Sequence, residues 1–236
     1  MAANSPPPIH HPLPPIHDGG FPAAPEGRAP TPVEAVVFDF DGTLVATRFA
    51  DEAAVAELIA SDPSAAAGAE TFWGHEGEPI LNRIELAWPG RGAMVLPLFE
   101  RQAPPRRFPG VVPLLRRLSR RGTRMAVVSS RRRAALHMGL AATGLGEFFP
   151  VVVGLEDVQA PKPSPEGLEL ALIGLGVSPS RAVYIGDNLL DVEAGRRAGM
   201  RVWRAAWGLS AAFPNGVVLL RRPSEVLQHL DRARPG

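Results

Sequence analysis

The chain has 236 residues, and its 25 basic and 24 acidic side chains give a formal charge of +1, which provides no basis for general affinity for nucleic acid. It contains no cysteine, which excludes disulfides, thiol catalysis and cysteine-ligated metal sites. Its length predicts one large domain or a core with a small accessory unit. The sequence shows no apolar signal core and no apolar run of about 18 residues, so we expect a cytoplasmic protein with no membrane partner.

The first 32 residues are unusually rich in proline. They hold 10 of the 26 prolines, together with His10, His11 and His17. Proline lacks a backbone donor and fixes its φ angle, so this composition excludes a helix or a central strand. We predict a disordered tail at 1–32, in which the histidines belong to a solvated segment rather than to a metal site.

Beyond the tail, short apolar runs alternate with helical patterns. Strands are predicted at 33–40, 123–128, 151–153, 182–185 and 200–204, with an edge strand at 217–220. Helices are predicted at 111–121, 132–142, 165–175, 189–198 and 224–231. Alternation of this kind is typical of an α/β fold, so we expect a Rossmann-like parallel sheet with helices on both faces.

One stretch, residues 46–106, interrupts the alternation and shows no convincing strand. Helical patterns occur in it at 52–60, 71–77, 81–88 and 94–101. We therefore predict a small α-helical cap at 46–106, inserted after the first strand of a core formed by 33–45 and 107–236.

Polar residues follow the predicted strands where each strand ends. Asp39 and Asp41 end the first, Ser129 ends the second, Lys162 follows the third and Asp187 ends the fourth. Each of them alone is also compatible with a turn or a helix cap. Because ligands of open parallel sheets gather at the carboxyl ends of the strands, their shared position favours one site.

The residue types indicate phosphoryl chemistry. Carboxylates in one cleft repel each other unless a cation lies between them, and hard oxygen ligands favour Mg2+. A carboxylate can also attack phosphorus as a nucleophile. Lys162 is the only lysine among 25 basic side chains, and a compact ammonium beside the Ser129 hydroxyl suits a bound phosphate.

These residues match a known pattern. The chain resembles the haloacid dehalogenase-like hydrolases, in their phosphoglycolate-phosphatase-like branch, over about residues 33–231. The resemblance rests on four motifs: Asp39-Phe40-Asp41-Gly42-Thr43-Leu44, then Ser129, then Lys162, then Gly186-Asp187 with Asp191.

The resemblance implies a role for each motif residue. Asp39 is expected to attack phosphorus and form an aspartyl phosphate, while Asp41 protonates the leaving oxygen and then activates water. Magnesium would be held by Asp39, Asp187 and the main-chain carbonyl of Asp41. The expected outer shell of the metal is Asp191 and Asn188, and the expected phosphate contacts are Ser129, Ser130, Lys162 and Gly42.

Other residues separate branches of the family. Dehalogenase members of the family lack an aspartate at the position of Asp41, so the chain is not expected to be a dehalogenase. Phosphonatase members need a second lysine, which this chain lacks, so that branch is excluded as well. Asp51 stands where hexose-phosphate mutases carry a histidine, which disfavours mutase activity. Ala46 stands where phosphoglycolate phosphatases usually carry aspartate, so phosphoglycolate itself is not indicated as the substrate.

Substrate choice is expected to come from the cap. The segment 71–79 combines glycines, an aromatic pair, a histidine and acidic residues. Candidate specificity residues are His75, Glu76, Arg48 and Arg83, each of which is also compatible with a solvated surface position.

The sequence thus predicts a Mg2+-dependent phosphatase, monomeric or homodimeric, that hydrolyses a small phosphorylated metabolite through an aspartyl phosphate. The alternatives are a pyrophosphatase or nucleotidase of the same family and a non-catalytic phosphate-binding module.

Overall fold

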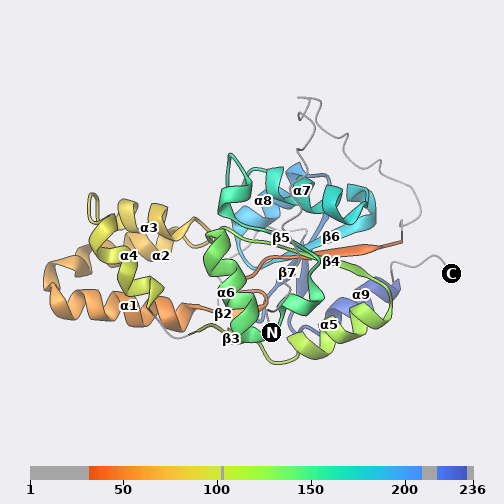
Figure 1. Cartoon of the computed structure of the whole chain (residues 1–236), viewed down its shortest axis with the longest axis horizontal. Helices are drawn as coiled ribbons and strands as arrows, with labels where there is room; N and C mark the ends of the chain where they lie inside the picture. The colour runs from red at the N-terminus through yellow and green to blue at the C-terminus, as the bar shows by residue number, and fades with distance from the viewer. Residues whose placement is uncertain (1–31, 102–103, 209–216, 233–236) are drawn as a thin grey trace, which may run out of the picture.

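The computed structural model describes residues 32–101, 104–208 and 217–232. Within these ranges a parallel sheet with flanking helices forms the core, and a group of helices extends from one side of it (Figure 1). The predicted tail at 1–32 lies, except for its last residue, outside the described residues. Among the described helices, none combines the length and the apolar composition that crossing a membrane requires.

The central sheet has six strands in the order β5-β4-β1-β6-β7-β8, and every neighbouring pair is parallel. The strands are β1 Ala35–Phe38, β4 Arg124–Val128, β5 Val151–Val153, β6 Ala182–Gly186, β7 Arg201–Ala205 and β8 Val218–Leu220. This arrangement confirms the predicted Rossmann-like α/β fold. β1 lies between β4 and β6 and is fully buried, as its continuous apolar sequence indicates.

Helices cover both faces of the sheet, because alternate residues of each strand face opposite sides. Val36 and Phe38 pack with α5 Val111–Arg120, α6 Arg133–Thr143 and α9 Glu225–Arg232. Ala35 and Val37 pack with α7 Glu166–Leu175 and α8 Leu189–Arg197 on the other face (Figure 1).

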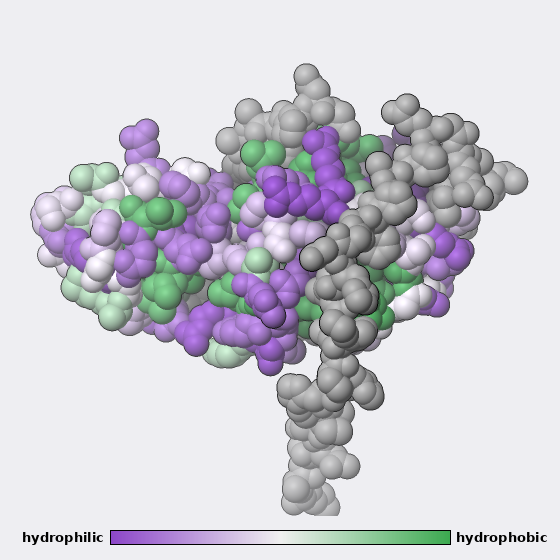
Figure 2. Space-filling view, turned by 90° about the horizontal axis from the view of Figure 1, so that it is seen from above, coloured by the Kyte–Doolittle hydropathy of each residue, from purple (hydrophilic) through white to green (hydrophobic). Residues whose placement is uncertain are grey.

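The helical cap follows β1 and has a core of its own. It contains α1 Arg48–Ser61, a 3-10 helix Pro63–Gly68, α2 Ala69–Gly74, α3 Ile80–Ala87 and α4 Gly92–Glu100. The Phe72 ring lies at its centre, with its centroid 5.5 Å from Trp88 and 5.1 Å from Phe99. On the face shown in Figure 2, hydrophobic and hydrophilic residues are interspersed over the cap.

The cap also joins the core in a way that the sequence did not predict. No strand was expected in 46–106, but β2 Val45–Ala46 pairs antiparallel with β3 Arg106–Arg107. Two-residue strands are too short for a periodic signal, and their pairing arises from the meeting of two distant linkers. The pairing holds the chain segments that enter and leave the cap side by side.

Candidate active site

Asp39 lies directly after β1, at the carboxyl edge of the sheet. Its backbone N–H donates to the carbonyl of Ile185 at 2.8 Å, and the residue is 3% exposed. Oδ1 accepts a hydrogen bond from Lys162 Nζ at 2.6 Å, whereas Oδ2 has no hydrogen bond to a described residue. Burial raises the pKa of Asp39 to about 8, although the Lys162 charge opposes that rise.

Lys162 is buried within this group rather than exposed on a loop. Its Nζ donates to Asp39 and, at 2.7 Å, to Asp191 Oδ1, and it lies 3.4 Å from the Tyr184 hydroxyl. Burial alone would lower the pKa of this amine, but Asp191 and Asp39 outweigh that effect and raise it well above its ordinary value. Lys162 therefore keeps a positive charge inside the protein.

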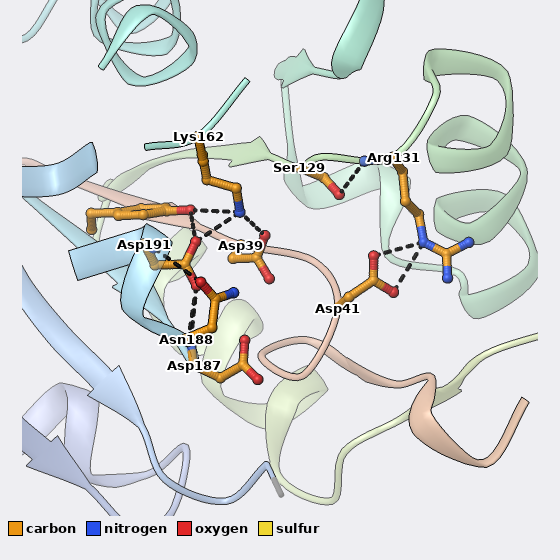
Figure 3. A network of polar contacts seen from close by, with 9 residues as sticks. Asp39, Asp41, Ser129, Arg131, Lys162, Asp187, Asn188 and Asp191 are labelled. Carbon is orange, nitrogen blue, oxygen red and sulfur yellow. Dashed lines mark hydrogen bonds and ion pairs between the residues drawn. The ribbon is translucent and has the colours of Figure 1, made fainter. Parts of the chain in front are cut away.

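Asp191 lies between Lys162 and the Asp187–Asn188 backbone in Figure 3. It is fully buried in the first turn of α8, and its Oδ2 accepts from the backbone N–H groups of Asp187 and Asn188, both at 3.1 Å. Its Oδ1 accepts from Lys162 and from the Tyr184 hydroxyl at 2.7 Å. Four donors occupy this carboxylate, so its geometry suits the predicted outer-shell role.

Three carboxylates converge here. One oxygen each from Asp39, Asp187 and Asp191 lies within 4.8 Å of the others. Asp187 Oδ1 is buried and has no hydrogen-bond partner among the described residues, and burial with neighbouring acids raises the pKa of Asp187 well above its ordinary value. Because four donors already occupy Asp191, the free lone pairs are those of Asp39 and Asp187, and they fit a hard divalent cation such as Mg2+. The exact ligand set stays a prediction.

Asp41 points away from this cluster in Figure 3 and toward Arg131, in the loop between β4 and α6. Arg131 Nε donates to both carboxylate oxygens, at 2.7 and 3.0 Å. The sequence did not predict this pair, because Arg131 is one of three consecutive arginines and no local pattern distinguishes it from the other two. The predicted acid–base residue Asp41 thus has a cationic partner that orients its carboxylate.

Three further predicted phosphate contacts, Ser129, Ser130 and Gly42, follow the ends of β4 and β1. Ser129 is buried at the end of β4, and its Oγ accepts from the Arg131 backbone N–H at 3.1 Å. Ser130 Oγ is buried and, in the described part of the chain, has no hydrogen-bond partner. Gly42 has φ +73°, and a Cβ there would overlap the Asp187 carboxylate, so the backbone geometry alone explains this glycine.

The four cap candidates are partnered within the cap. Arg48 donates to Glu76 at 2.6 Å and to Glu52, and His75 Nδ1 lies 2.7 Å from the Thr71 carbonyl.

Arg83 is buried rather than exposed. It pairs with Asp51 at 3.0 Å and stacks on the Phe72 ring. The structure does not bring this arginine or the other cap candidates into hydrogen-bond contact with the core carboxylates.

The cap nevertheless meets the core beside the site. A Cβ on Gly77 would lie 2.8 Å from the Asn188 side-chain oxygen, and Gly77 has φ +96°. The turn after α2 therefore rests against the residue that caps α8.

Comparison with known proteins agrees with this geometry. The family model for haloacid dehalogenase-like hydrolases matches residues 36–205, most of the chain. The chain belongs to this family. The family predicted from the four motifs is therefore confirmed.

Individual relatives are more distant. Pyrophosphatase PpaX of Oceanobacillus iheyensis is 28% identical over 183 residues, covering 75% of this chain and 85% of that protein. PpaX of Bacillus velezensis is 44% identical over 95 residues, but the chain spans only 44% of its length. The structure of CbbY from Rhodobacter sphaeroides, solved with phosphate, is 25% identical with a TM-score of 0.68, covering 84% of this chain and 99% of that one.

Proposed function

We propose that this protein is a Mg2+-dependent phosphatase that hydrolyses a small phosphorylated metabolite through an aspartyl phosphate on Asp39. The observation that carries the proposal is the buried Lys162–Asp39 pair at 2.6 Å beside the orphaned Asp187 carboxylate. Family membership and relatives named as pyrophosphatases support phosphoryl hydrolysis in general. CbbY, whose structure was solved in complex with phosphate, supports a phosphate site in a protein of this fold.

In the first step, Asp39 Oδ2 attacks phosphorus and the leaving oxygen departs. Lys162 and the Ser129 hydroxyl would hold the phosphoryl oxygens, together with backbone N–H groups at the start of α6. A bound Mg2+, held by Asp39, Asp187 and the Asp41 main-chain carbonyl, would supply charge stabilisation for the phosphoryl group.

In the second step, water attacks phosphorus and releases phosphate from Asp39. Asp41 would give its proton to the leaving oxygen in the first step and take one from this water in the second. Arg131 fixes the direction in which the Asp41 carboxylate faces before substrate binds.

Pyrophosphate hydrolysis is the second candidate, because PpaX of Oceanobacillus iheyensis aligns over 85% of its length. The alternative of a non-catalytic module is less favoured, since Asp39, Lys162 and Asp187 are all present and lie together.

A substrate panel tests the proposed function. The wild-type protein with Mg2+ is offered phosphomonoesters, nucleotides and pyrophosphate, and phosphate release is measured with and without chelator. We expect magnesium-dependent release from at least one phosphomonoester. Full activity in chelator would contradict the metal role, and hydrolysis of pyrophosphate alone would favour the second candidate.

Metal binding should stabilise the protein more at higher pH. Without metal, burial raises the pKa of Asp39 from 3.8 to about 8, so between these values the folded chain holds a proton that the unfolded chain has released. The free energy of unfolding of the metal-free protein therefore falls as pH rises through this window. Mg2+ binds the ionised carboxylates, so the rise in the Tm of the protein on adding Mg2+ should be larger at about pH 8 than at about pH 5.5.

Calorimetric melting with and without Mg2+ measures this difference. Asp187→Asn should lose most of the metal-induced increase, while Asp231→Asn, whose carboxylate pairs with Arg121 outside the cluster, should keep it. An equal increase at both pH values, or an undiminished one in Asp187→Asn, would rule out this cluster as the metal site.

The turn that meets the core is expected to influence substrate choice. Replacing His75 and Glu76 together by alanine removes the Glu76–Arg48 pair and both polar side chains next to Gly77. We expect kcat/KM to fall much more for the best substrate of the panel than for p-nitrophenyl phosphate. A parallel fall for both substrates would mean that this turn does not discriminate between leaving groups.

A further inference from the structure

A cleft of about 320 Å3 lies between the cap and the core. The cap contributes apolar side chains to it, Ile80 and Leu81 from α3 and Leu96 from α4. The core contributes Leu155, Ser130 and the charged residues Arg132 and Glu156. A volume of this order is at the low end of small-molecule sites, which run from roughly 300 Å3 upward.

This cleft shares two lining residues with a small cavity next to the predicted phosphate contacts. Ser130 follows Ser129 directly, and Ser130 and Leu155 also border the small cavity that Ser129 and Lys162 line. A phosphoryl group held between Asp39 and Ser129 would therefore have the cleft on the side of Ser130. A leaving group that extends in that direction meets apolar side chains of the cap on one side, and Leu155 next to the Arg132–Glu156 pair on the other.

The cations near the cleft already have partners. Arg132, which borders it, lies 3.4 Å from Glu156 and 3.7 Å from Glu100. Arg48, Arg83 and Arg131 also pair with carboxylates. A second phosphate in the cleft would have to compete with these carboxylates for its cationic partners.

We propose that the cleft binds the leaving group, and that the substrates are phosphate monoesters whose leaving group is uncharged and largely apolar, rather than pyrophosphate. This inference rests on the proposed phosphatase function of the adjoining site. Leu81, which is 45% exposed in the protein alone, would be covered by such a group and contribute apolar contact area.

Binding of n-alkylphosphonates tests the proposal without turnover, because their carbon–phosphorus bond is not the bond that a phosphatase cleaves. Titration calorimetry with Mg2+ compares methyl- to hexylphosphonate with methylenediphosphonate, which mimics pyrophosphate. We expect affinity to rise about three- to fourfold for each added methylene group, and hexylphosphonate to bind more tightly than methylenediphosphonate.

Two matched variants locate the effect. Leu81→Asn should flatten the dependence on chain length while leaving methylphosphonate affinity unchanged. Leu86→Asn changes a residue on the same helix that is 50% exposed and does not line the cleft, so it should keep the wild-type dependence.

The outcomes separate this inference from the proposed function. Affinity that does not depend on chain length, or tighter binding of methylenediphosphonate, overturns the inference even if p-nitrophenyl phosphate is hydrolysed. An equal dependence in wild type and Leu81→Asn overturns it as well. Affinity that rises with chain length in a protein that hydrolyses no ester would support the cleft and contradict the phosphatase assignment.

Discussion

Replacing Asp39 by asparagine is expected to abolish phosphatase activity and leave the fold intact. Asparagine has nearly the same volume as aspartate, and Lys162 keeps its partner Asp191, so the buried charge is not left alone. The amide cannot attack phosphorus, and loss of a nucleophile lowers kcat by at least about 10⁴ in comparable cases. Turnover of p-nitrophenyl phosphate with Mg2+ measures the effect, and circular dichroism verifies the fold.

The matched control is Asp157→Asn, which makes the same chemical change in a carboxylate that pairs with Arg133. It should retain wild-type turnover. If purified Asp39→Asn turns over within tenfold of wild type, Asp39 is not the nucleophile.

Lys162→Arg should lower kcat/KM by at least about 10² although it keeps the charge. The ammonium occupies a closed position between Asp39, Asp191 and Tyr184, with heavy-atom distances of 2.6, 2.7 and 3.4 Å. A planar guanidinium is larger and directs its donors in a fixed fork, so it cannot reproduce all three contacts.

Steady-state kinetics on p-nitrophenyl phosphate measures that loss. Arg133→Lys, an exchange between the same two residue types on the exposed start of α6, should leave kcat/KM unchanged. Unchanged kinetics in Lys162→Arg would show that the shape of this cation does not matter for phosphoryl transfer.

Much of the core could be predicted from the sequence because its signals are local. β1 and β6 are buried on both faces, so each reads as a continuous apolar run with Asp39 or Asp187 at its end. The rule that parallel strands present their carboxyl ends at one edge then brings the groups together. Lys162 was recognisable because it is the one lysine of an arginine-rich chain.

The remaining features arise from pairings between distant residues. Tyr184 has the appearance of a core strand residue, and only the fold places its hydroxyl on Asp191. Arg131 belongs to an arginine run, and its partner Asp41 lies 90 positions earlier. Arg83 was predicted as a candidate specificity residue, but it pairs with Asp51 and stacks on the Phe72 ring. Ion pairs between residues that are far apart in the sequence leave no periodic pattern in it.

Trapping the aspartyl phosphate on Asp39 tests the proposed mechanism most directly. Wild-type protein turning over p-nitrophenyl phosphate with Mg2+ is quenched in acid, digested and analysed by peptide mass spectrometry. We predict a phosphorylated peptide with the modification on Asp39, absent when substrate is omitted and absent from Asp39→Asn. Phosphate found on another residue, or continued modification in Asp39→Asn, would contradict the mechanism.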